Sequence, residues 1–165
     1  SPRVTRGGRF DEYARPSFAE GRPVLEAALD LNHRIHREFK YDPGATQVDT
    51  PAEDALRSRS GVCQDFAHVM ICCLRSKGIP ARYVSGYLRS NPKFVGAEAS
   101  HAWVSFYCPG AGWIDLDPTN DVAPSLAHVT LAWGRDYGDV PPVKGVTLGG
   151  GAQKIVVGVG VTARP

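Results

Sequence analysis

The 165-residue sequence predicts an α+β fold, in which helices come first and an antiparallel sheet follows. Apolar residues recur at helical spacing in the first half, while the second half has Tyr- and Val-rich segments separated by Gly and Pro turns. The length suits one compact core. We therefore expect an irregular segment over residues 1–22 and a single domain over residues 23–165.

Helices are predicted at three places in the first half. Residues 23–39 carry apolar side chains at helical spacing, which predicts an amphipathic helix over the core. Thr50 is predicted to cap a short second helix, with Pro51 at its first position. Residues 63–77 lack Gly and Pro and are apolar on most faces, which predicts a central, buried helix that ends at Gly78.

Strands are predicted after this helix. Residues 81–88 are rich in Tyr and Val and predict a strand. The segments 101–107 and 113–117 flank a turn rich in Gly and predict a β-hairpin. Three later segments also have strand-like sequences: residues 129–133, 143–148 and 154–161. The last two predict a closing hairpin.

Cys63 is the candidate nucleophile. It opens the predicted central helix, where unpaired backbone amides and the positive end of the helix dipole favour the reactive thiolate. Gly61, just before it, lets the loop and a substrate come close. A buried helix would hold such a nucleophile rigidly. The remaining cysteines are interpreted as packing residues: Cys72, Cys73 and Cys108.

His101 and Asp117 are the candidate base and orienting acid, and the register of the hairpin decides whether they can meet. One register pairs Cys108 with Gly112 and places Asp117 on the same face as His101. The other register pairs Cys108 with Trp113 and turns the two side chains to opposite faces, so that a contact would need a β-bulge. The sequence allows both registers.

Other polar and aromatic residues receive structural interpretations. Asp115 competes with Asp117 as the acid, because both would face the same way on a strand. Asp65 lies in the first turn of the central helix, where a carboxylate suits the dipole. Trp103 and Trp113 are interpreted as cross-strand packing. Four histidines are interpreted as surface or satisfied interior residues: His33, His36, His68 and His128.

The composition disfavours several classes of partner. The net charge is +2 with basic and acidic residues interspersed, so we expect neither nucleic acid nor membrane partners. No stretch approaches the roughly 18 apolar residues of a membrane span, and no signal peptide is expected. The four cysteines lack the spacing of a zinc site or a disulfide framework, which favours a reducing compartment and a cytoplasmic location. The sequence begins with Ser1, consistent with a trimmed or processed chain.

Four sequence blocks, in one order along the chain, resemble the transglutaminase-like superfamily, specifically its bacterial branch of candidate cysteine peptidases and amidases. The blocks are residues 61–68 (GVCQDFAH), 78–87 (GIPARYVSGY), 101–104 (HAWV), and 112–113 (GW) with 117–120 (DPTN). The resemblance covers roughly residues 39–119. It implies a papain-like, transglutaminase-core fold, in which the central helix bearing the nucleophilic Cys packs on an antiparallel β-sheet or barrel.

The resemblance also implies roles for the candidate residues. It identifies residues 23–165 as a catalytic domain and carries a Cys-His-Asp triad onto Cys63, His101 and Asp117. The implied chemistry is acyl transfer through a thioester, with no cofactor and no metal. The backbone amide of the cysteine would bind the oxyanion, and the second donor is unassigned because the nearest upstream glutamine, Gln47, is too distant.

Hydrolysis of a peptide or protein amide is the predicted activity, because the bacterial branch is mostly described as peptidase-like and nothing here resembles the calcium sites of animal transglutaminases. The first alternative is a protein-glutamine transglutaminase, in which an amine resolves the thioester. The second alternative is a non-catalytic module that binds peptides. Metal-dependent hydrolysis is disfavoured, because the sequence lacks clustered ligands at metal spacing.

Overall fold

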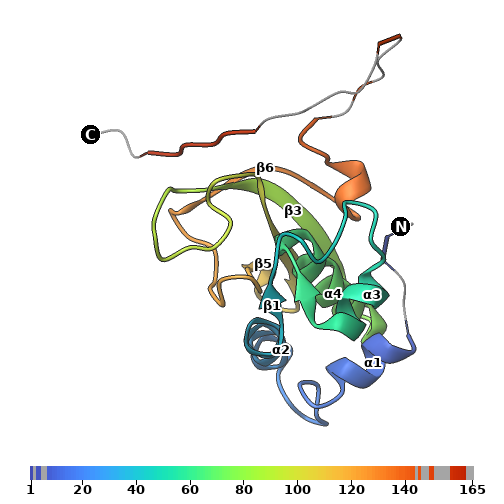
Figure 1. Cartoon of the computed structure of the whole chain (residues 1–165). Helices are drawn as coiled ribbons and strands as arrows, with labels where there is room; N and C mark the ends of the chain where they lie inside the picture. Colours follow the sequence, from blue (N-terminus) through green and yellow to red (C-terminus); the bar gives the residue numbers. More distant parts are fainter. Residues whose placement is uncertain (2, 5–6, 144, 146–148, 151–156, 163–165) are drawn as a thin grey trace.

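The structure is a computed structural model that describes residues 1, 3–4, 7–143, 145, 149–150 and 157–162. In this part of the chain, helices lie on one side of an antiparallel sheet, as predicted (Figure 1). The helices are α1 (Arg9–Ala14), α2 (Val24–Glu38), α3 (Ala52–Ser58) and α4 (Cys63–Ser76). The strands of the sheet are β3 (Ala81–Leu88), β4 (His101–Cys108), β5 (Gly112–Leu116) and β6 (His128–Gly134), in the order β5-β4-β3-β6.

Helix α4 is the central element, as the sequence predicts. Every residue from Cys63 to Leu74 is buried, because the sheet covers one side of the helix and α1, α2 and α3 cover the others. The largest buried side chains include Phe66 and Met70 on the helix and Phe106 on the sheet. These side chains form the core that holds the first residue of α4 in place.

The hairpin of β4 and β5 adopts one of the two registers that the sequence allows. Cys108 pairs with Gly112, so that Val104 lies opposite Leu116. Continuing this alternation places Asp117, directly after β5, on the same face as His101 at the start of β4. No bulge is needed for the two side chains to meet.

A short parallel pair was not predicted from the sequence. Strand β1 (Lys40–Tyr41) pairs with β2 (Ser60–Gly61), and the pairs are Lys40 with Ser60 and Tyr41 with Gly61. Two-residue strands carry too little pattern to be recognised in a sequence. The pair fixes the chain that leads into α4.

The prediction that residues 1–22 are irregular is wrong for α1. Phe10, Tyr13 and Ala14 are buried and join the core cluster. A helix of six residues shows little periodicity in a sequence, and its stability comes from packing against α4 rather than from local propensity.

Two smaller predictions also differ, and a third falls largely on residues that the structure does not describe. Helix α3 begins at Ala52 with Pro51 in the cap position, and the Thr50 hydroxyl instead accepts a hydrogen bond from the Gln47 amide at 2.8 Å. The apolar face predicted over residues 23–39 is only partly buried, because Leu29 of α2 is exposed while Leu31 and Ile35 are buried. The predicted closing hairpin lies largely outside the described residues, and the described part of it forms no strand. No helix of the described chain is long and apolar enough to span a membrane.

Candidate active site

Cys63 is the first residue of α4, at the point where β2 leads into the helix. The carboxylate of Asp65 accepts hydrogen bonds from the Val62 amide at 2.8 Å and the Thr46 hydroxyl at 2.6 Å, which confirms its structural role. A Cβ on Gly61 would lie 2.4 Å from the Asp65 Oδ2 atom, and Gly61 has a φ of 156°. Only glycine therefore fits the approach to the cysteine, for a reason the sequence did not reveal.

His101 is the first residue of β4 and pairs with Gly86 of β3. Its side chain is fully buried, and its Nε2 atom lies 2.8 Å from Asp117 Oδ2. Its Nδ1 atom has no hydrogen-bond partner within the described residues. His101 and Cys63 line the same pocket of about 180 Å³. The arrangement leaves one imidazole nitrogen available at the pocket that holds the thiol.

Asp117 directly follows β5 and pairs with Val122 across a tight turn. Oδ1 accepts the amides of Thr119 and Asn120, at 2.9 and 3.3 Å. Oδ2 accepts the Asn120 side-chain amide at 2.8 Å, besides His101. These donors fix the carboxylate in one orientation and compensate for its burial.

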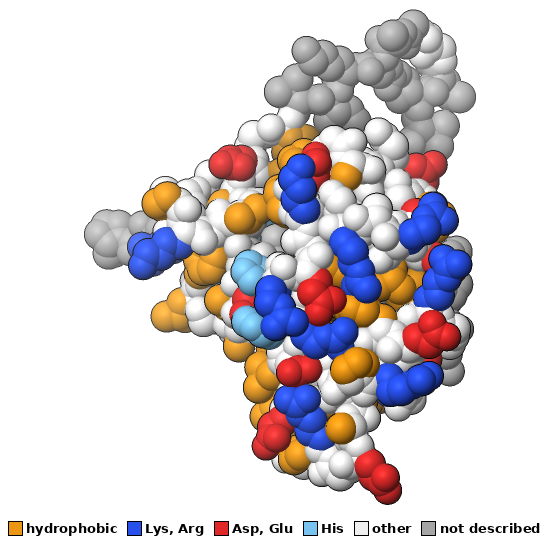
Figure 2. All heavy atoms as spheres, turned by 60° about the horizontal axis from the view of Figure 1, so that its bottom comes forward, with side chains coloured by type: hydrophobic (Ala, Val, Ile, Leu, Met, Phe, Trp, Pro, Cys, Tyr) orange, Lys and Arg blue, Asp and Glu red, His pale blue; other side chains and the backbone are white. Residues whose placement is uncertain are grey.

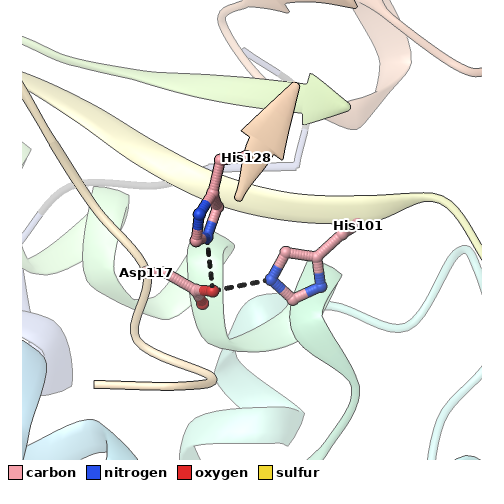
Figure 3. Close-up of side chains that lie close together, drawn as sticks. All are labelled: His101, Asp117 and His128. Atoms are coloured by element: carbon pink, nitrogen blue, oxygen red, sulfur yellow. Dashed lines mark hydrogen bonds and ion pairs between the residues drawn. The ribbon is translucent and has the colours of Figure 1, made fainter. Parts of the chain in front are cut away.

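His128, at the start of β6, also reaches this carboxylate (Figure 3). Its Nε2 atom lies 3.1 Å from Asp117 Oδ2, and its side chain is nearly fully buried. The sequence interpretation treated His128 as a surface or satisfied residue without a partner block, and it missed this contact. The position of His128 at the start of a strand was the available sequence signal for a role in the site. It could not show that the side chain contacts Asp117.

Charge in the site favours an imidazolium next to a carboxylate. Burial alone would lower the pKa of His101, but its hydrogen bond to Asp117 and the adjacent Cys63 thiol raise the pKa to about 10. Burial alone would raise the pKa of Asp117, but hydrogen bonds from His101 and His128 hold it well below its usual range. His101 is therefore held in its charged form near neutral pH.

His101, Asp117 and His128 are also metal-ligand residue types. One ligand atom from each lies within 4.8 Å of the other two. Sequence spacing did not reveal this cluster. The same atoms already form the hydrogen bonds of the site, so a metal ion would have to displace the Nε2 protons of both histidines.

The competing residues lie where the structural interpretations put them. Asp115 accepts a hydrogen bond from Trp103 Nε1 at 3.0 Å, whereas His101 is bonded to Asp117. Trp103 is fully buried, as expected for packing. His68 is a satisfied interior residue, because its Nε2 atom accepts the Tyr137 amide at 3.2 Å. The other cysteines are buried, as expected for packing: Cys72, Cys73 and Cys108.

Several known proteins are similar to this chain in sequence or in fold. The profile of the transglutaminase-like superfamily matches residues 11–118. An uncharacterized protein of Mycobacterium tuberculosis is 43% identical over 154 residues, which cover 88% of this chain and 48% of that protein. A protein-glutamine gamma-glutamyltransferase of Pseudomonas aeruginosa is 37% identical over 114 residues, or 64% of this chain and 17% of that protein. The structure of a candidate cysteine protease from Cytophaga hutchinsonii has a TM-score of 0.69 at 33% identity, covering 81% of this chain and 44% of that one.

The chain belongs to the transglutaminase-like superfamily and has its papain-like core fold, as its four sequence blocks predict. It spans about half the length of the mycobacterial relative it matches.

Proposed function

We propose that the chain is a cysteine-dependent acyl-transfer enzyme that hydrolyses an amide bond in a peptide or protein. Cys63 is the nucleophile, His101 is the base and Asp117 is the orienting acid. The observation that carries the proposal is the buried pair of His101 and Asp117, at 2.8 Å, whose remaining imidazole nitrogen lies at the pocket that also holds Cys63.

The reaction follows the chemistry of other thiol nucleophiles. His101 Nδ1 already holds the thiol proton of Cys63 in an ion pair, and the thiolate sulfur attacks the carbonyl carbon of the amide. The Cys63 amide has no partner within its helix and can donate to the oxyanion. His101 then protonates the leaving amine, the C–N bond breaks, and a thioester remains. Water, deprotonated by His101, attacks the thioester and releases the acid.

The lining of the pocket favours a substrate whose side chain next to the reacting carbonyl is uncharged. Its described lining contains no carboxylate, Lys or Arg, and consists of residues such as Val48, Gln64, Tyr83 and Tyr137 besides the cysteine and the histidine. His101 is already paired with Asp117, so a charged substrate side chain would be desolvated there without a free counter-charge. Substrates with an apolar or amide side chain next to the reacting carbonyl therefore fit best.

Transamidation is a second candidate. The similarity to a protein-glutamine gamma-glutamyltransferase favours it, and the similarity to a candidate cysteine protease favours hydrolysis. The two reactions share the thioester and differ in whether water or an amine attacks it. Incubating the protein with casein and a biotinylated primary amine separates them. Biotin incorporation that depends on Cys63 would establish transamidation, while new peptide termini without incorporation would establish hydrolysis.

Alkylation tests the nucleophile and base directly. Iodoacetamide should label Cys63 rapidly near neutral pH, because His101 holds the thiol proton. His101→Ala should slow labelling by at least about tenfold, and Cys63→Ala should abolish turnover. Cys108→Ala is the matched control, since Cys108 lies outside the site, and it should label like the native chain. Equal labelling rates in the native and His101→Ala chains would refute the pair and favour the peptide-binding module.

A further inference from the structure

We propose that His128 is a positioning residue that holds the Asp117 carboxylate in the orientation that His101 requires. The inference rests on the proposed function, since it adds a fourth residue to that site. His128 comes from β6, at the edge of the sheet, whereas His101 comes from β4. Strand β6 carries no residue of the proposed triad, so this role would make β6 part of the site.

The contact is specific and enclosed. His128 Nε2 lies 3.1 Å from the same oxygen, Asp117 Oδ2, that His101 Nε2 approaches to 2.8 Å (Figure 3). Only 2% of the His128 side chain is exposed, and none of the Asp117 side chain is. Water therefore does not compete for the bond, which strengthens it relative to an exposed one.

The protons on the two rings follow from their shared acceptor. A carboxylate only accepts hydrogen bonds, so both Nε2 atoms must carry hydrogen. The Nδ1 atom of His128 then points into the buried interior, with no hydrogen-bond partner in the described part of the chain. The Nδ1 atom of His36, in contrast to that of His128, has a hydrogen-bond partner, because it donates to the Thr119 carbonyl at 2.9 Å. Burying an imidazole with one unsatisfied nitrogen costs free energy. The hydrogen bond to the Asp117 carboxylate is the polar contact that offsets this cost.

Aromatic neighbours prevent the His128 ring from turning away. The Trp103 ring meets it edge to face, with centroids 5.2 Å apart, and Phe94 does so at 5.8 Å. Trp103 also stacks against His101, with centroids 6.2 Å apart. The two histidines are thus packed against one indole while they donate to one oxygen. Moving His128 would shift the carboxylate and, through it, the base.

Substitutions at position 128 separate hydrogen bonding from packing. His128→Phe keeps an aromatic ring but removes the donor, and His128→Gln restores an N–H donor of similar reach. We expect kcat for p-nitrophenyl acetate to fall on the order of 10- to 100-fold in His128→Phe, with KM nearly unchanged. His128→Gln should recover most of this loss. The control is Trp133→Phe on the same strand, because Trp133 is 57% exposed and lies outside the site.

A measurement that does not need turnover completes the test. The proton shared by His101 and Asp117 should give a downfield NMR signal in the native chain, weakened or shifted in His128→Phe and restored in His128→Gln. Equal kcat and an unchanged signal in folded His128→Phe would overturn the proposal, as would equal losses in the Phe and Gln variants. If the native chain showed no turnover, the proposed function would fail, while the NMR signal would still decide the role of His128.

Discussion

The chemistry proposed for this protein depends on a single buried carboxylate. Asp117 accepts hydrogen bonds from two imidazoles, one side-chain amide and two backbone amides. An ionised carboxylate without such donors would be strongly unfavourable in the interior. With them, it stays charged and stabilises the imidazolium of His101. His101, the proposed base, is therefore oriented and kept charged by residues that lie far from it in the sequence.

The imidazole of His101 should titrate well above its ordinary range. Its pKa of about 10, compared with an ordinary value of 6.5, means that the ring should remain protonated through neutral pH. An NMR titration of the imidazole should find this raised pKa in the native chain. In Asp117→Asn, the same titration should move to lower pH, because the largest interaction that raises the pKa is lost. A native value near 6.5 would contradict the geometry.

The stability of the pair should also depend on pH. Because the pKa of His101 is higher in the folded than in the unfolded chain, the stabilisation is fully present below about pH 6.5 and is lost as pH rises through about 10. Removing one partner leaves a buried uncompensated charge, so Asp117→Asn should lower the free energy of unfolding by roughly 3–5 kcal/mol near pH 6. Urea denaturation at pH 6 and above pH 10 should show a smaller loss at the higher pH.

At the scale of elements, the site lies where the ends of one helix and three strands meet. The cysteine begins α4, His101 begins β4, Asp117 follows β5 and His128 begins β6. Helix α2 also holds the loop that carries the acid, because Asn32 Nδ2 donates to Asp121 Oδ1 at 3.0 Å. Ends of rigid elements place side chains accurately while leaving one side open to a substrate.

The start of α4 should depend on Asp65. Asp65→Ala removes the acceptor for the Val62 amide and the Thr46 hydroxyl, so it should lower the free energy of unfolding by about 2 kcal/mol. Asp54→Ala is the control, because Asp54 is also a first-turn carboxylate but is paired with Arg57 in an exposed ion pair. Its loss should stay below about 0.5 kcal/mol. Equal shifts in the urea midpoints would refute the structural role of Asp65.

At the scale of the whole molecule, one core includes the N-terminal helix. Helix α1 packs against α4, and its Phe10 is only 3% exposed. On the helical face of the molecule, Lys and Arg side chains are interspersed with Asp and Glu, so no single sign of charge dominates there (Figure 2). The helices thus stabilise the molecule mainly through their buried faces, while the site lies at the ends of α4 and of the strands.

The contribution of α1 can be measured by truncating Phe10. Phe10→Ala should lower the free energy of unfolding by about 3–5 kcal/mol, because it leaves a cavity in the core. Leu126→Ala is the control, since Leu126 is 100% exposed, and it should change stability by less than about 0.5 kcal/mol. If Phe10→Ala also left the unfolding midpoint unchanged, residues 1–22 would lie outside the cooperative core.

The sequence by itself determined the α+β class, the central helix, the strands over 81–88 and 101–107, and the order of the candidate nucleophile, base and acid. Each of these depends on residues that are close together in the chain, where periodicity and turn chemistry act. The tertiary structure alone decided the hairpin register, the burial of α1, the β1–β2 pair and the contact between His128 and Asp117. These depend on which of several possible long-range contacts buries the most apolar surface while satisfying the buried carboxylate, and no local pattern encodes that choice.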